Sequence, residues 1–229
     1  MRIAVLLAAL LLVAGCSSVG NRAGQTTTSA PYTSGSATAA APSTTKPPAP
    51  SAAPQAGAPI SDVIAWIEAA RLADATHYHS ATRDGVTIDL GRDIAFTASG
   101  ATVRCMTDAK HTGGTLSCLV HLINPPPRPA AVYGGWRGGW VDFDGISLQV
   151  GSARADPGPF TNGDGAELAS GESLEFGDFR CRSDQTAVFC VNYAHRSAVR
   201  FAAAGIEQFG CLQPVPPPEG IGQKFSCST

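Results

Sequence analysis

Charged side chains are scarce in this sequence. Asp, Glu, Lys and Arg together make up 15% of the 229 residues, whereas glycine occurs 25 times and proline 17 times. An amphipathic surface helix needs a charged or polar face, and both glycine and proline disfavour helix interiors. The composition therefore argues against a helical bundle and favours short strands joined by turns.

Basic clusters are also missing. The net charge is −2, and Arg2, Arg22 and Lys46 all precede the first acidic residue, Asp62. The rest of the chain therefore carries 13 Lys and Arg against 18 Asp and Glu. Proteins that bind nucleic acid usually present a basic surface. We expect no nucleic-acid partner.

The apolar run at the N-terminus, residues 3–13, is too short for a resident membrane-spanning helix. It follows Arg2 and leads into small residues, as in a signal peptide. The string Leu-Val-Ala-Gly-Cys that ends at Cys16 resembles the bacterial lipobox. That resemblance implies cleavage before Cys16 and attachment of lipid to its sulfur and its new amine. The alternative is an ordinary secretory signal, with Cys16 left as a chance thiol.

The seven cysteines are an odd number. If Cys16 carries lipid, the other six can all pair in an oxidising compartment. We therefore predict a protein on the exported face of the cell membrane, in the cell envelope, whose partner is membrane lipid through acylated Cys16.

The remaining six cysteines allow fifteen pairings, but a repeated pattern selects one. Residues 103–120 and 179–193 each read as an apolar residue, arginine and cysteine, then a turn, then a cysteine among apolar residues. Directly opposed residues of an antiparallel hairpin lie within disulfide reach. The predicted disulfides are Cys105–Cys118, Cys181–Cys190 and, by elimination, Cys211–Cys227.

Composition divides the chain into three parts. Residues 1–15 form the signal peptide. Residues 16–59 begin at the lipidated cysteine and consist largely of Ser, Thr, Ala, Pro and Gly, which have little to bury and predict a disordered tether. Residues 60–229 form the disulfide-rich domain.

The domain is predicted to be mainly β, an antiparallel sandwich or barrel of short strands with disulfide-pinned hairpins and one N-terminal helix. The helix is expected over residues 62–71, with Ser61 as its N-cap. About ten strands with alternating apolar residues follow from residue 86 onward. Two proline runs cannot lie in central strands. We interpret residues 124–129 as the crossover between two halves and residues 214–218 as a polyproline loop.

Several segments are closely similar to a family of mycobacterial cell-envelope lipoproteins with paired cysteine hairpins. They are residues 96–100 before Cys105, the hairpin to Cys118, residues 179–181 and 188–193 around Cys181 and Cys190, and residues 124–129, 140–145 and 151–160. Ala98 stands where that family usually has proline. The resemblance implies an envelope lipoprotein, and it implies no reaction.

Two constellations of polar residues invite a catalytic or metal-binding interpretation. His77 and His79 would share one side of an extended segment, but they lack a partner at recognisable spacing, so we predict no metal and no cofactor. Asp142 and Asp144 would lie about 7 Å apart on one strand face, a separation that suits the carboxylate pair of a glycosidase. The simpler interpretation of that pair is a solvated strand end before an Asp-Gly turn.

An aromatic segment is the strongest candidate for ligand binding. Tyr133, Trp136 and Trp140 are interleaved with glycines, and an extended chain would project both indoles to one side as a platform for a glycan or lipid. The opposing interpretation is that the indoles pack into the core.

We therefore predict a membrane-anchored, non-catalytic module that binds a ligand or partner or has a structural role, with no catalytic residues. Its ligand would be an envelope glycan, lipid or protein. The alternative is an envelope hydrolase that uses Asp142, Asp144 or a histidine.

Overall fold

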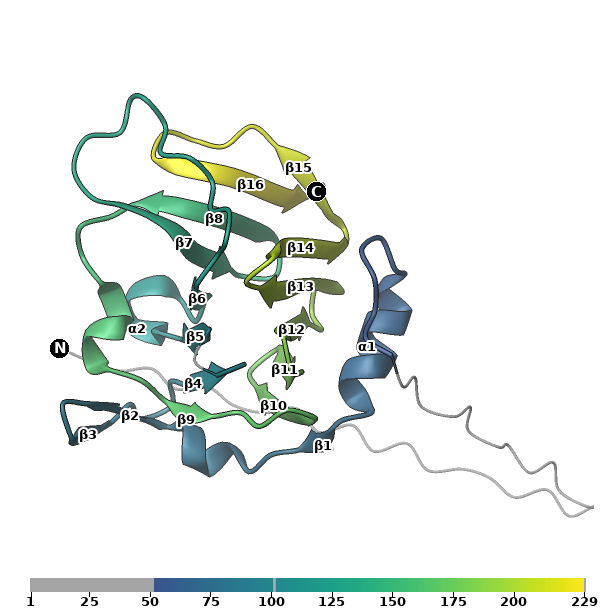
Figure 1. Ribbon diagram of the computed structural model, residues 1–229. Helices are drawn as coiled ribbons and strands as arrows, with labels where there is room; N and C mark the ends of the chain where they lie inside the picture. The colour runs from purple at the N-terminus through teal and green to yellow at the C-terminus, as the bar shows by residue number, and fades with distance from the viewer. Residues whose placement is uncertain (1–51, 101, 229) are drawn as a thin grey trace, which may run out of the picture. The chain divides into compact units, whose positions relative to one another are not determined.

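The computed structural model describes residues 52–100 and 102–228. The predicted signal peptide, Cys16 and most of the predicted tether lie outside the described residues. In the part described, a six-stranded and an eight-stranded sheet face each other across a hydrophobic core, as Figure 1 shows. This confirms the prediction of a mainly β, largely antiparallel fold.

The six-stranded sheet has the order β1-β10-β11-β12-β13-β14. Its strands are β1 (Arg71–Leu72), β10 (Glu172–Phe176), β11 (Phe179–Ser183), β12 (Ala187–Asn192), β13 (Ser197–Ala202) and β14 (Gly205–Gly210). Every neighbouring pair is antiparallel except β1 and β10. Alternate residues such as Cys181, Val188 and Phe201 point into the core between the sheets.

The eight-stranded sheet has the order β15-β16-β8-β7-β6-β5-β4-β9. Its strands are β15 (Leu212–Val215), β16 (Ile221–Cys227), β8 (Ser147–Ala153), β7 (Trp136–Phe143), β6 (Leu116–Val120), β5 (Val103–Met106), β4 (Ala95–Ala98) and β9 (Ala166–Glu167). A separate hairpin pairs β2 (Ser80–Arg83) with β3 (Val86–Asp89). The chain passes from one large sheet to the other between β1 and β4, after β9 and again after β14.

Short helices accompany the sheets. They are α1 (Ile60–Glu68), α2 (Ala109–Thr112) and the 3₁₀ segments η1 (Ala75–Tyr78) and η2 (Gly158–Asn162). None of the helices in residues 52–100 and 102–228 is both long and apolar enough to cross a membrane. α1 packs on the outer face of the six-stranded sheet through Val63, Trp66 and Ile67, whose spacing places them on one side of a helix.

The expected bounds of the first helix were wrong at both ends. Pro59 occupies the N-cap position, and its carbonyl accepts from the amides of Asp62 and Val63. Ser61 is already helical, and its hydroxyl contacts the Asp62 carboxylate instead. The helix ends at Glu68 because Arg71 pairs with Glu172 in the sheet as part of β1.

The folded part also begins before residue 60. Ala53 and Ala58 are partly buried against the cluster that α1 forms on the sheet. Residues 52–59, which composition places in the tether, therefore contribute to the domain surface.

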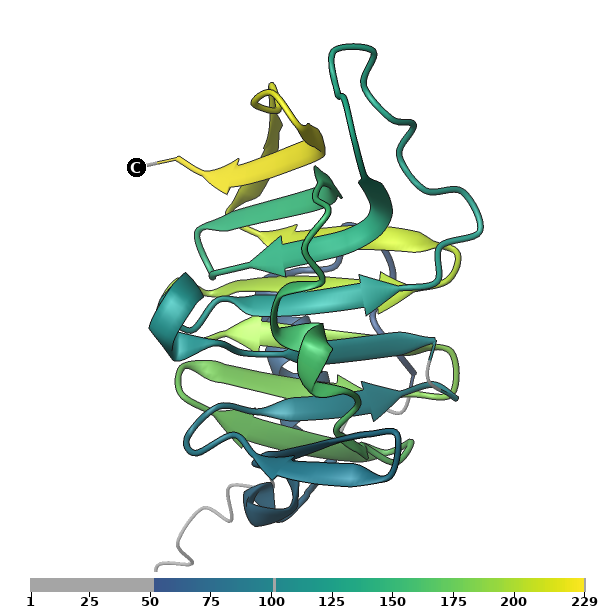
Figure 2. The same ribbon diagram turned by 90° about the vertical axis from the view of Figure 1, so that its left-hand side faces the viewer.

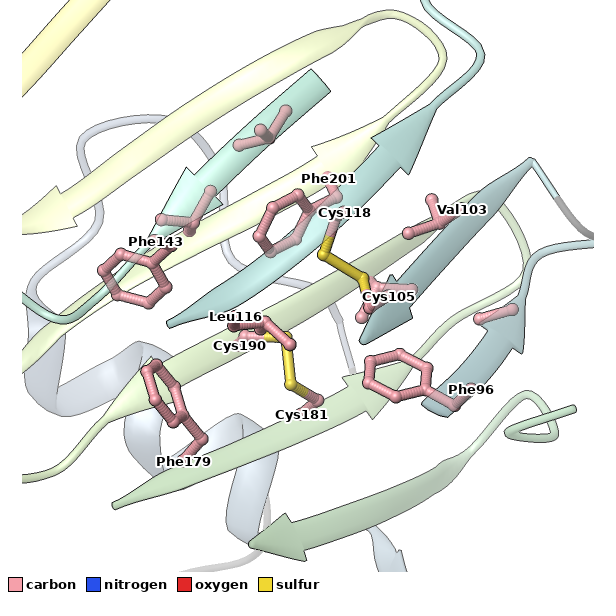
Figure 3. Close-up of a cluster of buried hydrophobic side chains, with 14 of the residues drawn as sticks. Phe96, Val103, Cys105, Leu116, Cys118, Phe143, Phe179, Cys181, Cys190 and Phe201 are labelled. Atoms are coloured by element: carbon pink, nitrogen blue, oxygen red, sulfur yellow. A yellow bond between two sulfur atoms is a disulfide. The ribbon is translucent and has the colours of Figure 1, made fainter. Parts of the chain in front are cut away.

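The predicted disulfides are all present in the described residues: Cys105–Cys118, Cys181–Cys190 and Cys211–Cys227. The first two join directly opposed residues of β5 and β6 and of β11 and β12. Figure 3 shows both of them among the core side chains between the sheets. All four of their cysteines are 0% exposed, so these two bonds are part of the core packing.

Both interpretations of the proline runs need correction. Residues 124–129 join β6 to β7, which are direct neighbours in one sheet, so this run is not a crossover between halves. Pro214 lies in β15, opposite Phe225. A proline is tolerated there because β15 is an edge strand, where one side of the backbone needs no hydrogen bond.

The outer face of the eight-stranded sheet is covered too. Figure 2 shows η2 in front of this sheet, with the β2–β3 hairpin at its lower end. Phe160 of η2 and Ala81 of β2 pack with Trp140 and Met106 in a small apolar cluster.

The three disulfides should differ in their resistance to reduction. Cys211 and Cys227 are partly exposed, whereas the four interior cysteines are fully buried. Because a reductant must reach the sulfur, limited dithiothreitol on the folded chain should open Cys211–Cys227 first. Alkylation and peptide mass mapping will show this order, and early labelling of Cys181 or Cys190 would contradict it.

Stability at alkaline pH should depend on Tyr193. Burial, a 3.0 Å hydrogen bond from its hydroxyl to Glu68 Oε1 and the charge of that carboxylate raise the pKa of Tyr193 to about 12. Since the unfolded chain has the lower tyrosine pKa, about 10, this contribution is complete below pH 10 and is lost as the pH rises towards 12. Tyr193→Phe should therefore lose less stability than the wild type across that interval. Denaturant unfolding will measure it, with exposed Tyr133→Phe as the control.

Candidate functional site

A sizeable hollow lies where the ends of both sheets meet. We call this hollow, of about 460 Å³, the end groove. The residues that form it come from the segment before β4 and from the β5–β6, β7–β8, β10–β11 and β12–β13 connections. In an antiparallel meander alternate connections lie at the same end, which is why segments 100 residues apart in sequence converge here.

The floor of the end groove is buried and the rim is charged. Ile94, Thr107, Phe179 and Asn192 form the floor. The rim carries exposed side chains of both signs, namely Arg92, Asp144, Asp178 and His195. The groove therefore offers a polar ligand both hydrogen-bond donors and acceptors.

One wall, formed by α2 and its flanking loop, is held by two aspartates. Asp93 Oδ1 accepts from Thr107 Oγ1 at 2.9 Å and from the Ala109 amide at 2.8 Å. Asp108 caps α2 by accepting from the His111 amide at 3.1 Å. These bonds fix the loop before any ligand arrives.

The opposite wall joins the two sheets through Asn192. Asn192 Oδ1 accepts from the His195 amide at 3.1 Å, and the side chain packs on Gly145 of the β7–β8 turn. A Cβ on Gly145 would lie 2.5 Å from Asn192 Cγ, so this approach requires glycine. Ser197 donates to the Gly145 carbonyl, which ties the β7–β8 turn to the β12–β13 turn.

A second hollow of about 230 Å³ adjoins the end groove. It is lined by Thr112, Thr115, Asp142, Asp144, Ser147 and Gln149. The two hollows share Thr112, Thr115 and Asp144, so they form one continuous depression that runs onto the outer face of the eight-stranded sheet.

The carboxylate pair singled out in the sequence lines this second hollow, but both groups hold the local structure. Asp142 Oδ1 accepts from Ser117 Oγ at 2.5 Å and from Trp140 Nε1 at 2.9 Å. Asp144 Oδ1 accepts from the amides of Ile146 and Ser147 and shapes the turn. The turn interpretation therefore accounts for Asp144, and an internal network accounts for Asp142.

The aromatic segment does not form the predicted platform. Trp140 is 1% exposed, because Phe160 meets its ring edge-on at 5.1 Å and Arg154 lies 4.1 Å from its ring centroid. Trp136 is partly buried over Gly151 and donates to the Pro126 carbonyl, while Tyr133 is 93% exposed. The interpretation of both indoles as core residues holds for Trp140, although it lies on an outer sheet face rather than between the sheets.

The glycines of this segment serve close packing. A Cβ on Gly139 would lie 2.1 Å from the Val120 carbonyl oxygen, and one on Gly138 would lie 2.7 Å from Pro125. The glycines therefore let the β7 backbone approach its neighbours and do not open the indoles to a ligand.

The histidine pair is also not arranged as expected. His77 lies in η1 rather than in an extended segment, so it and His79 do not share a side. His77 is near Asp74, and the ring of His79 contacts the Asp93 carbonyl at 3.0 Å. Across residues 52–100 and 102–228, no three His, Cys, Asp or Glu side chains group in a way that could hold a metal ion.

Sequence reasoning singled out Asp144 but missed the other charged and polar residues that line the end groove. Arg92, Asp178, Asn192 and His195 stand singly in separate connections, and no local motif marks them. The one available signal for the end groove was the order of the hairpins. The Asp-Gly turn between β7 and β8 and the Gly-Asp turn between β10 and β11 both lie at the end of the structure where the groove forms.

No protein-family model, curated protein or solved structure matches the chain.

The bonds to Asp142 lead to a prediction. Asp142→Ala would leave the buried Ser117 hydroxyl and the Trp140 indole without their shared acceptor, so unfolding free energy should fall by about 1–3 kcal/mol. In a double-mutant cycle with Trp140→Phe, the two losses should not add, because both changes remove the same hydrogen bond. Urea unfolding of the four proteins will measure the coupling, and simple additivity would contradict it.

Proposed function

We propose that this chain is an exported cell-envelope lipoprotein, anchored through acylated Cys16, whose β domain is a non-catalytic binding module. The observation that carries the proposal is the use of cysteine. The six cysteines of the described part are all consumed in disulfides, which form and persist in oxidising compartments. That leaves Cys16, at the end of the lipobox-like string, as the one sulfur for lipid.

The similarity to mycobacterial envelope lipoproteins with paired cysteine hairpins supports the same proposal. Of the residues that carry the resemblance, 188–193 belong to the β11–β12 hairpin, and 96–100 lie in β4 and the turn that leads into the β5–β6 hairpin. The disulfides of both hairpins lie in the core. We propose that the chain is an envelope lipoprotein of that kind.

The end groove supports a binding role. Its walls are fixed by internal hydrogen bonds that the side chains of Asp93, Asp108 and Asn192 accept, so little ordering would be needed when a ligand enters. The sequence suggests an envelope glycan, lipid or protein as the ligand. The charged rim of the end groove favours the polar members of these classes.

The hydrolase alternative has one observation in its favour, since Asp142 and Asp144 line the same hollow. A general acid or base must, however, reach a substrate proton. Asp142 Oδ1 accepts two internal hydrogen bonds and Asp144 Oδ1 accepts two backbone amides. These contacts favour binding over catalysis.

Cys16→Ala tests the anchor. Without the thiol no lipid can be attached, so the variant should move from the membrane pellet to the soluble exported fraction, and metabolic labelling with a clickable fatty acid should vanish. Immunoblots of fractionated cells will measure this.

The matched control is a Cys211→Ala, Cys227→Ala double variant, which also removes thiols but keeps Cys16. It should stay in the membrane fraction and keep the label. A Cys16→Ala chain that still sediments with membranes would defeat the proposal.

A further inference from the structure

We propose that the end groove and the adjoining hollow together bind a saccharide chain of several sugar units. This inference rests on the proposed function of the domain as a binding module and names the class of its ligand.

The first argument is the mixture of donors and acceptors. A sugar hydroxyl both donates and accepts, so a saccharide site needs both kinds of group side by side. Asp178 supplies a carboxylate acceptor on the rim, and Arg92 supplies donors. The hydroxyls of Thr112 and Thr115, where the hollows join, can do either.

The second argument is a buried amide at the floor. Asn192 is 3% exposed and lines the groove. Its Oδ1 accepts from the His195 amide, whereas no acceptor for its Nδ2 is found among the described residues. The Nδ2 atom is not shut off from solvent, so it reaches the groove and can donate to a ligand hydroxyl there.

The third argument is an aromatic ring at the edge of the groove. Phe176 is partly exposed and lines it, and its ring is stacked on Phe179 at a centroid distance of 5.7 Å. The C–H face of a sugar ring is apolar and can lie against such a ring while its hydroxyls reach the polar rim.

The fourth argument is the extent of the depression. The end groove alone is within the range of about 300–1,000 Å³ that small-ligand sites occupy. The second hollow continues it past Thr115 to Gln149. A monosaccharide would use one hollow, whereas a chain of sugars can occupy both.

The free carboxylate on the rim gives the sharpest test. In the part of the chain described, Asp178 accepts through its backbone carbonyl but not through its side chain, so Asp178→Asn should leave the fold unchanged. Replacing a charged acceptor of one ligand hydrogen bond should weaken binding about tenfold or more. The matched control is Asp84→Asn, the same change at a side chain 89% exposed on the β2–β3 hairpin.

A second variant tests the continuity of the two hollows. Gln149→Met keeps the length of the side chain and removes its amide from the second hollow. It should weaken binding of a hexasaccharide several-fold and leave binding of the corresponding disaccharide unchanged, since the shorter ligand need not reach Gln149.

The probes are neutral hexasaccharides of glucose, mannose, galactose or N-acetylglucosamine, each with its disaccharide. The full chain would be purified from membranes in a detergent without a sugar headgroup, and binding followed by calorimetry and saturation-transfer NMR. The expected result is at least one hexasaccharide that binds at least tenfold more tightly than its disaccharide, with the losses given above for Asp178→Asn and Gln149→Met.

Two results would overturn the saccharide assignment: no hexasaccharide binds the folded chain, or Asp178→Asn binds it as well as Asp84→Asn does. Either can occur while Cys16 still controls membrane attachment, and then the anchored module stands with a ligand of another class. Loss of that dependence on Cys16 would instead remove the proposed function itself.

Discussion

The packing of two disulfides between the sheets is the constraint on which the rest of this structure depends. Cys105–Cys118 and Cys181–Cys190 each join residues directly opposite one another, and both lie in the same core. A slip of either hairpin by one residue would turn its inward side chains to the outer face. The covalent bonds forbid that slip, and so they fix which side chains, among them Val103 and Phe179, face inward.

The end groove follows from this fixed register. The disulfides keep β5 in register with β6 and β11 in register with β12. The connections at the α2 end of the two sheets are therefore held at fixed positions relative to one another. Asn192 can then pack on Gly145 across the two sheets, and Ser197 can reach the Gly145 carbonyl. The two disulfides between the sheets therefore also hold in place the end groove and the Asn192 amide in its floor.

Local patterns predicted the two hairpins well. A pair of cysteines in alternating strands indicates which residues lie opposite each other, and the apolar residues at the same alternation show which face of the strand points into the core. They failed where tertiary contacts decide. Pro214 is tolerated because β15 lies at an edge, and Trp140 is buried because a distant segment, η2, folds over it. The end groove could not be predicted from local patterns, since its residues meet only once the strand order is known. The sequence shows which hairpins form but not which of their turns become neighbours.

Most faces of the two sheets are covered, so a polar ligand is left mainly with the two ends of the structure. α1 covers the outer face of one sheet and η2 part of the other, while the core fills the space between them. Of the two ends, one is lined by prolines of the β6–β7 and β15–β16 loops together with Arg128, Glu219 and Gln223. Proline has no N–H, so the prolines give a hydroxylated ligand no backbone donor, and Arg128 already donates to the Val132 carbonyl. In the part described, the α2 end is lined by no proline and has carboxylates, Arg92 and the Asn192 amide, and this is where we place the proposed hydroxyl-rich ligand.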